Sequence, residues 1–205
     1  MKNTLLRSLL TLSVFTTIQL SCTASSIFYK PSITKGDPKA LKGKKIKVVF
    51  AYDGMMVGEM KEEDYVGGKV REYNAKKPGR GDKWLAEWKS NRSNLFEPAF
   101  IKEFNYQGEK IQTSVQTKAD SSIYTLVVTT TFAEPGFNLG PIERAARINV
   151  ICDFRDANGN SIVTIVLNNI ASPTMLNDDF ETSTRFSECY TRLGKELCKV
   201  IKKSQ

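Results

Sequence analysis

Residues 142–154 read IERAARINVICDF, and residues 161–170, which follow the turn sequence DANGN, read SIVTIVLNNI. In the first run, apolar side chains occupy alternate positions near its end: Ile148, Val150, Cys152 and Phe154. This alternation is typical of a strand with one buried and one wet face. Asn158-Gly159 is a strong short hairpin signal. The two runs therefore predict an antiparallel hairpin that turns at residues 156–160.

Two further strands are predicted on the amino-terminal side of this hairpin. Residues 124–132, YTLVVTTTF, are a run of β-branched and aromatic residues, which favours a strand. Residues 45–52, KIKVVFAY, predict another strand, which ends at the turn signal Asp53-Gly54. Between these strands the period becomes helical. We expect Asp82 to cap a helix that carries Trp84 and Trp88.

A second helical segment follows, with Pro98 in its first turn and one apolar stripe: Phe96, Phe100, Ile101 and Phe104. Residues 55–81 give no clear period, and Gly67-Gly68 with the sequence KPGRG at residues 77–81 favours a loop.

Residues 182–203 predict a carboxyl-terminal amphipathic helix. Its apolar stripe comprises five residues: Phe186, Tyr190, Leu193, Leu197 and Ile201. We expect this stripe to pack on the sheet face that carries Ile148, Val150 and Cys152. The order of elements then predicts an α+β fold, with an antiparallel or mixed sheet of about four strands and helices packed on one face.

The first residues resemble a bacterial lipoprotein signal. Lys2 and Arg7 precede residues 8–20, a run of mostly apolar residues without charge that is too short to span a bilayer, since that takes roughly 20 apolar residues. Ser21 and Cys22 then resemble a lipobox, in which the cysteine becomes the acylated first residue. The resemblance implies a signal peptide at residues 1–21 and a palmitate-type acyl anchor on Cys22. The alternative is an ordinary signal peptide cut after Ala24, with Cys22 discarded.

Residues 22–43 are expected to form a flexible basic tether that is dispensable for folding. Residues 30–47 hold seven lysines and one acid, whereas residues 48–205 hold 21 basic and 21 acidic side chains. Lysines near an anionic lipid surface support anchoring, although they also suit a plain solvated linker. A neutral body disfavours nucleic-acid binding. A single α+β domain is then predicted over residues 44–205.

The predicted elements suggest a family resemblance. An early strand, helices with an aromatic stripe, a strand meander and a last helix containing LGKELCKVIK at residues 193–202 resemble uncharacterised outer-membrane lipoprotein domains. They are similar to small α/β domains of envelope-assembly lipoproteins, such as those related to the curli secretion channel, and to the amino-terminal domain of the Tol–Pal propeller protein. The resemblance implies binding or assembly and supplies no catalytic residue.

The sequence offers little to support catalysis. Histidine is absent, which excludes histidine-based triads and imidazole metal ligands. Neither a cofactor motif nor a metal-ligand set is predicted, and Asp156 is interpreted as a turn residue rather than a calcium ligand. Trp84 and Trp88 are interpreted first as core and second as a stacking face for sugar or protein.

The remaining cysteines allow no complete pairing. Cys189 and Cys198 are predicted on opposite faces of the last helix, too far apart to bridge each other. Cys152 faces inward and is open to pairing with either one. We expect at least one buried free thiol.

The sequence thus favours a lipid-anchored, non-enzymatic binding or assembly module of a bacterial envelope. We expect it at the outer membrane, on the periplasmic or surface face, with an envelope protein as partner. The alternative is an exported carboxylate-dependent hydrolase, for which Asp153, Asp178 and Asp179 are the candidates.

Overall fold

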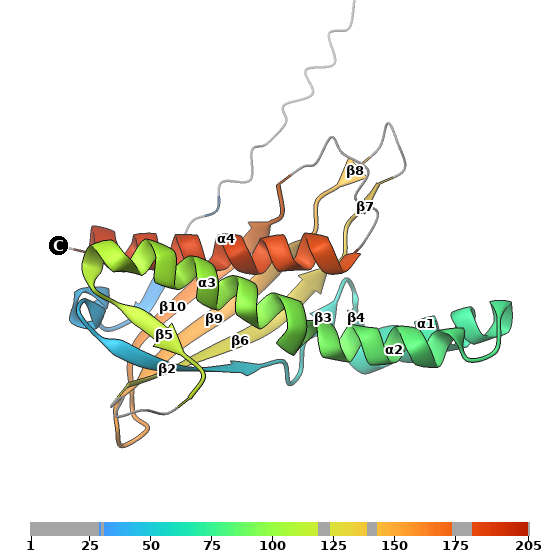
Figure 1. Ribbon diagram of the computed structural model, residues 1–205, viewed down its shortest axis with the longest axis horizontal. Coiled ribbons are helices and arrows are strands. Elements are labelled where there is room, and N and C mark those ends of the chain that lie inside the picture. Colours follow the sequence, from blue (N-terminus) through green and yellow to red (C-terminus); the bar gives the residue numbers. More distant parts are fainter. Residues whose placement is uncertain (1–28, 30, 119–123, 139–142, 174–181, 205) are drawn as a thin grey trace, which may run out of the picture.

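The computed structural model describes residues 29, 31–118, 124–138, 143–173 and 182–204. Cys22, Asp178 and Asp179 lie outside these residues. The described part forms two layers, in which helices cover one face of a twisted sheet (Figure 1).

The described residues contain an eight-stranded mixed sheet. Six strands follow the order β1–β10–β9–β6–β2–β5. Their bounds are β1 (Ser32–Lys35), β2 (Lys45–Ala51), β5 (Ser114–Gln116), β6 (Tyr124–Glu134), β9 (Arg147–Arg155) and β10 (Ser161–Ala171). The strand β3 (Met56–Val57) pairs with both β6 and β4 (Met60–Lys61). A separate pair joins β7 (Phe137–Asn138) to β8 (Glu143–Arg144).

The mixed sheet is confirmed, but the expected number of about four strands is wrong. β2 runs parallel to β5 and β6, while β1, β10, β9 and β6 pair antiparallel. The strands absent from the prediction are β1, β3, β4 and β5, which have two to four residues each. A strand this short has no measurable alternation, so only its neighbours in the sheet define it.

The predicted hairpin is present as β9 and β10. Cys152 lies opposite Ile165 and Val150 opposite Leu167, and all four side chains are fully buried. At the turn, the Asp156 carboxylate accepts hydrogen bonds from backbone N–H groups of Asn158 and Asn160, each at 2.9 Å. The first strand of this hairpin begins later in the sequence than expected. β9 starts at Arg147, while residues 143–144 belong to β8.

Four α-helices complete the described fold, linked in part by short helical turns. Their bounds are α1 (Glu62–Lys76), α2 (Arg80–Asn91), α3 (Glu97–Gly108) and α4 (Thr182–Lys203). A π-helical turn, η2 (Arg92–Phe96), joins α2 to α3, and η1 (Pro38–Leu41) and η3 (Glu109–Ile111) are 3₁₀ turns. The helices α3 and α4 lie side by side across the sheet, and the α1–α2 hairpin projects beyond its end (Figure 1).

The apolar stripe of helix α4 packs on the sheet, as predicted. All five residues of its stripe are buried in the cluster that also holds Ile148, Val150 and Cys152. Gly194 permits the close approach of α3, because a Cβ atom there would stand only 2.7 Å from the Phe100 carbonyl oxygen. The helix is therefore covered on two sides, by the sheet and by α3.

The packing of α4 on both sides explains why both of its cysteines are buried. Cys189 and Cys198 are both buried although they lie on opposite faces of the helix. Cys152, Cys189 and Cys198 are all free thiols. The expectation of at least one buried free cysteine is confirmed.

Residues 32–43 belong to the domain, so the predicted tether over residues 22–43 is wrong in this part. The four residues of β1 are exposed, yet they pair with β10 through the backbone. In η1, Pro38 is buried and Leu41 is fully buried. Backbone pairing needs no apolar side chain, which is why a lysine-rich segment contains a strand.

Residues 62–76 form α1, where Gly67-Gly68 favoured a loop. Each glycine in a helix interior costs about 1 kcal/mol relative to alanine. Three acidic residues in the first turn and Lys76 in the last complement the helix dipole. Helix α2 begins at Arg80, so Asp82 lies inside its first turn and is not the cap.

Candidate functional site

A cavity of about 360 Å³ opens between the α1–α2 hairpin and the start of α4. It is lined by residues of α1, α2, η2 and α4 and by Pro135 and Gly136, which follow β6. We call it the aromatic cleft, because six aromatic side chains contribute to its walls: Tyr65, Tyr73, Trp84, Trp88, Phe96 and Phe186. Polar side chains beside these rings include Lys69, Glu87 and Asn91.

The rings of the α1–α2 hairpin form a contiguous group. Trp84 and Trp88 stand four residues apart on α2, with ring centroids 5.4 Å apart and planes inclined by 31°. Tyr65 contacts Trp88 at 5.6 Å, and Tyr73 contacts Trp84 at 5.7 Å. All four side chains are half-buried. A continuous ring surface therefore faces the cavity while one side remains packed.

Close helix packing holds the two halves of this ring surface together. Gly81 lies against the backbone of α1, where an added Cβ would stand 2.3 Å from the Val70 carbonyl oxygen. The Gly81 N–H donates to the Asn74 side chain at 2.7 Å. Any larger residue at position 81 would separate the helices and with them the rings.

Cations gather around Tyr73 at the outer end of the cleft. Lys69, Lys76 and Arg80 lie 5.5, 5.7 and 5.3 Å from the centroid of its ring. Glu72 forms ion pairs with Lys69 at 3.1 Å and with Lys76 at 2.7 Å. The hydrogen bond that Lys69 donates to Glu72 raises the pKa of Lys69, so this lysine stays charged.

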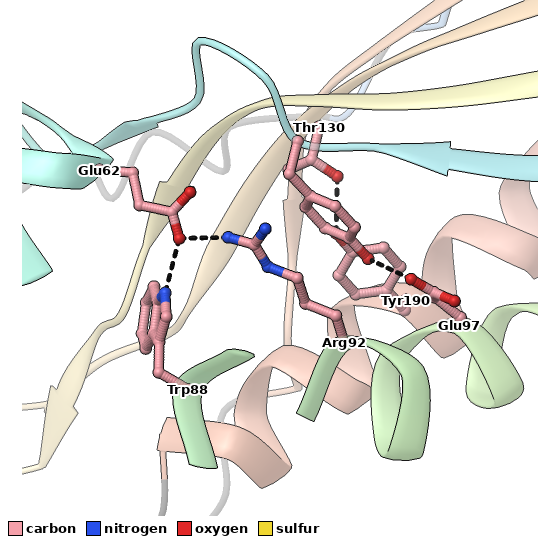
Figure 2. A network of polar contacts seen from close by, with 7 residues as sticks. Glu62, Trp88, Arg92, Glu97, Thr130 and Tyr190 are labelled. Carbon is pink, nitrogen blue, oxygen red and sulfur yellow. Dashed lines mark hydrogen bonds and ion pairs between the residues drawn. The ribbon is translucent and has the colours of Figure 1, made fainter. Parts of the chain in front are cut away.

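A polar joint fixes the base of the hairpin to the body (Figure 2). The Trp88 indole N–H donates to Glu62 at 2.6 Å, and Arg92 donates to the same oxygen. The guanidinium of Arg92 also lies 4.1 Å from the centroid of the Tyr52 ring. Because Trp88 belongs to both the joint and the cleft, the joint sets the position of one cleft wall.

The polar joint continues toward the core. Tyr52 donates to Glu97 at 3.3 Å, and the hydroxyls of Thr130 and Tyr190 are 2.6 Å apart (Figure 2). Burial raises the pKa of Tyr190 to about 12. Burial also raises the pKa of Glu97, although the Tyr52 hydrogen bond and the charge of Arg92 oppose it.

The two tryptophans have different roles in the structure. Trp88 is bonded to Glu62 and contacts Phe186 of the core edge-on at 6.1 Å. Trp84 contacts only other rings of the hairpin among the ring pairs of the described residues. The interpretation as a core residue therefore fits Trp88. The contacts of Trp84 are compatible with the alternative, a stacking face for sugar or protein.

Asp153 is the one hydrolase candidate that the structure describes. It accepts hydrogen bonds from Arg155 Nε at 2.7 Å and from Thr164 Oγ1 at 3.2 Å. Although burial alone would raise its pKa, hydrogen bonds from Ser161, Arg155 and Thr164 hold the pKa below its ordinary value. Asp153 is thus a paired carboxylate on the sheet and does not line the aromatic cleft.

The other predicted site residues are not brought into the cleft. Cys22, Asp178 and Asp179 lie outside the described residues. Within the residues that the structure describes, no three His, Cys, Asp or Glu side chains gather as metal ligands.

The cleft residues of α1 were not predicted from the sequence: Tyr65, Lys69 and Tyr73. A signal was present, because these positions follow the four-residue spacing of one helix face. The intervening Gly67-Gly68 concealed it.

The fold and the cavity define a two-layer α+β domain with an aromatic cleft at one end. Among the described residues, no helix has the length and apolar character needed to cross a bilayer. Neither a protein-family model nor a curated protein sequence matches the chain.

Similar solved structures include two of the PelC dodecamer from Paraburkholderia phytofirmans, one of them a single-residue variant. The TM-scores are 0.41 for the variant and 0.40 for the other form, each at 12% sequence identity, covering 83% of this chain and 97% of that one. A similarity of this size carries no argument about what this chain binds.

Proposed function

We propose that this protein is a non-enzymatic binding module of a bacterial envelope, anchored by an acyl group on Cys22, with the aromatic cleft as its binding site. The observation that carries the proposal is the cleft itself. Ligand sites are typically concave and lined by aromatic side chains with a few polar groups. A cavity of about 360 Å³ walled by six aromatic residues, with Lys69, Glu87 and Asn91 among the polar ones, has this composition.

The envelope location rests on the amino-terminal sequence. A charged start, a short apolar run and small residues before Cys22 are the features of an exported, acylated chain. Since β1 begins at Ser32, ten residue steps separate the anchor from the folded domain. At about 3.3–3.6 Å per residue, the domain lies within roughly 35 Å of the acylated residue. The module therefore operates close to the membrane surface.

The intrinsic fluorescence of the protein reports on the cleft. The chain has two tryptophans, and both line the cleft. We expect a polysaccharide, lipid-vesicle or soluble-protein fraction of the envelope to shift the emission of the mature protein. The shift should be lost in Trp84→Ala and kept in Tyr106→Ala, which changes an exposed aromatic residue of α3. Circular dichroism verifies that both variants are folded.

Two results would contradict the binding proposal. One is that no envelope fraction alters the emission of the folded parent. The other is that Trp84→Ala and Tyr106→Ala bind alike by calorimetry, which would place the site elsewhere.

The anchor has a separate test. Cys22→Ala should leave an uncleaved precursor that no longer incorporates a fatty-acid analogue in growing cells. Cys198→Ala, which changes a buried thiol, is the control that should label normally. Undiminished labelling of Cys22→Ala would show that Cys22 carries no lipid.

A further inference from the structure

We propose that the ligand of the aromatic cleft is an acidic glycan, a sugar chain that carries carboxylate groups. This inference rests on the proposed function and names the chemical class of its ligand. Two independent features of the cleft support it, the shape of its ring surface and the distribution of charge around it.

The ring surface suits sugar rings. A pyranose presents a face of C–H groups and a rim of hydroxyls, so it stacks on an aromatic ring while its rim bonds to polar side chains. Trp84 and Trp88 both line the cavity and are half-buried, so the pair presents aromatic surface for such a contact. The side chains of Glu87 and Asn91 line the same cavity and supply acceptors and donors for hydroxyls.

The charge around the cleft suits an anion. Residues 69–83 hold six basic side chains and two acidic ones, a net charge of +4. The rest of the domain, residues 32–205 without this segment, holds 21 basic and 20 acidic side chains, a net charge of +1. The hairpin tip is thus a local positive patch on a body that is otherwise nearly neutral, and it attracts carboxylates preferentially.

Arg80 is the residue best placed to receive a carboxylate. It is exposed and lies over the Tyr73 ring at the outer end of the cleft. No carboxylate of the described residues forms an ion pair with it, whereas Lys69 and Lys76 share Glu72. A planar guanidinium with free donors recognises carboxylates through two parallel hydrogen bonds.

The same features disfavour a bilayer or a flat protein surface as the ligand. Of the six cleft rings, Phe96 and Phe186 are buried and the other four are half-buried, so the rings are not presented as a wedge for lipid. A glycan is a narrow, flexible chain of sugar rings, so an acidic glycan can enter such a cavity without displacing the helices.

The test compares hexamers of galacturonic acid and of galactose, which match in length and differ in charge. Tryptophan emission and calorimetry should show that the mature protein binds the acidic hexamer at least about tenfold more tightly. Arg80→Gln should weaken that binding roughly tenfold, the loss expected for one charge-assisted hydrogen-bonded contact. Trp84→Ala should abolish it.

Arg192→Gln is the matched control. Arg192 is an exposed residue of α4 outside residues 69–83, it does not line the cleft, and the substitution removes the same charge. Its affinity for the acidic hexamer should equal that of the parent.

Other outcomes overturn the inference in distinguishable ways. Equal binding of both hexamers, unaffected by Arg80→Gln, would make the cleft a site for neutral sugar. Binding of phosphatidylglycerol vesicles or of an envelope protein, without either hexamer, would refute a glycan and leave the proposed function intact. If no envelope fraction changes the emission, the proposed function fails as well.

Discussion

Glu62 connects the projecting hairpin to the body of the protein. It opens α1 and accepts hydrogen bonds from Trp88 and Arg92. The side chains of Glu62 and Arg92 are only 16% and 22% exposed, so water screens the pair weakly. Removing one partner of a buried ion pair leaves an uncompensated charge. The geometry of the cleft therefore depends on a contact at its base, in which Trp88 of the cleft wall takes part.

Glu97 provides a prediction about pH. Burial raises its pKa above that of the unfolded chain, so the folded state holds the proton more tightly. Stability contributed by this group is present below the unfolded pKa and falls as pH rises through the folded pKa. Glu97→Gln, which has no such proton, should therefore gain melting temperature relative to the parent between about pH 4 and pH 7.

Thermal unfolding of both proteins at the two pH values measures this difference. Glu87→Gln serves as the control, because it makes the same substitution at an exposed position. A gap between Glu97→Gln and the parent that is constant with pH would contradict the raised pKa.

At the scale of elements, α4 is the main cover of the sheet. Its apolar stripe faces the strands, and Gly194 allows α3 to pack on its other side. Because both faces are packed, the helix has little freedom to bind a partner. The proposed binding role therefore falls to the α1–α2 hairpin, in which α1 has no fully buried residue.

Leu193 tests the structural role of α4. Its side chain is fully buried, and a core Leu→Ala change costs about 2–5 kcal/mol. For a domain of this size, each kcal/mol lowers the melting temperature by about 2–4 °C. Leu193→Ala should therefore melt at least several degrees below the parent.

Arg192 is the neighbouring control. It is exposed and donates a hydrogen bond to the Ala171 carbonyl at 3.1 Å, so Arg192→Ala should change stability by less than about 0.5 kcal/mol. Calorimetry of the two variants beside the parent decides the matter. A silent Leu193→Ala would mean that the stripe is not core.

At the scale of the whole molecule, the edge of the sheet determines where the domain begins. β1 covers the outer edge of β10, and Leu41 joins the core from the segment that follows. An uncovered edge strand is a template for unwanted pairing. Residues 32–43 thus stabilise the domain and close one edge of its sheet.

A shortened chain measures this contribution. A protein that starts at Lys44 loses the β1 pairing and the burial of Leu41, so we expect a loss of at least about 2 kcal/mol, the lower value for deleting a core leucine. A protein that starts at Tyr29 keeps both features and also the packing of Tyr29 against the core, so it should melt like one that starts at Thr23. Equal melting of the Lys44 and Tyr29 forms would restore the view that residues 23–43 are dispensable.

The sequence by itself determined the elements whose period is long enough to detect. The eleven residues of β6 and of β10, the nine of β9 and the 22 of α4 repeat their patterns several times. Core residues such as Val150 of β9 and Leu193 of α4 could therefore be named in advance. The turn at Asn158-Gly159 was equally local, because its conformation depends on adjacent residues.

The short strands and the aromatic cleft depend on contacts between segments that are distant in the sequence. β1 is defined by the backbone of β10, which lies more than a hundred residues away in the chain. Likewise α1 exists against its two glycines because α2 packs on it, with Gly81 at the point of closest approach. Tyr73, Trp84 and Phe186 share one cavity for the same reason. Contacts between distant segments arise from packing, and packing leaves no period in the sequence.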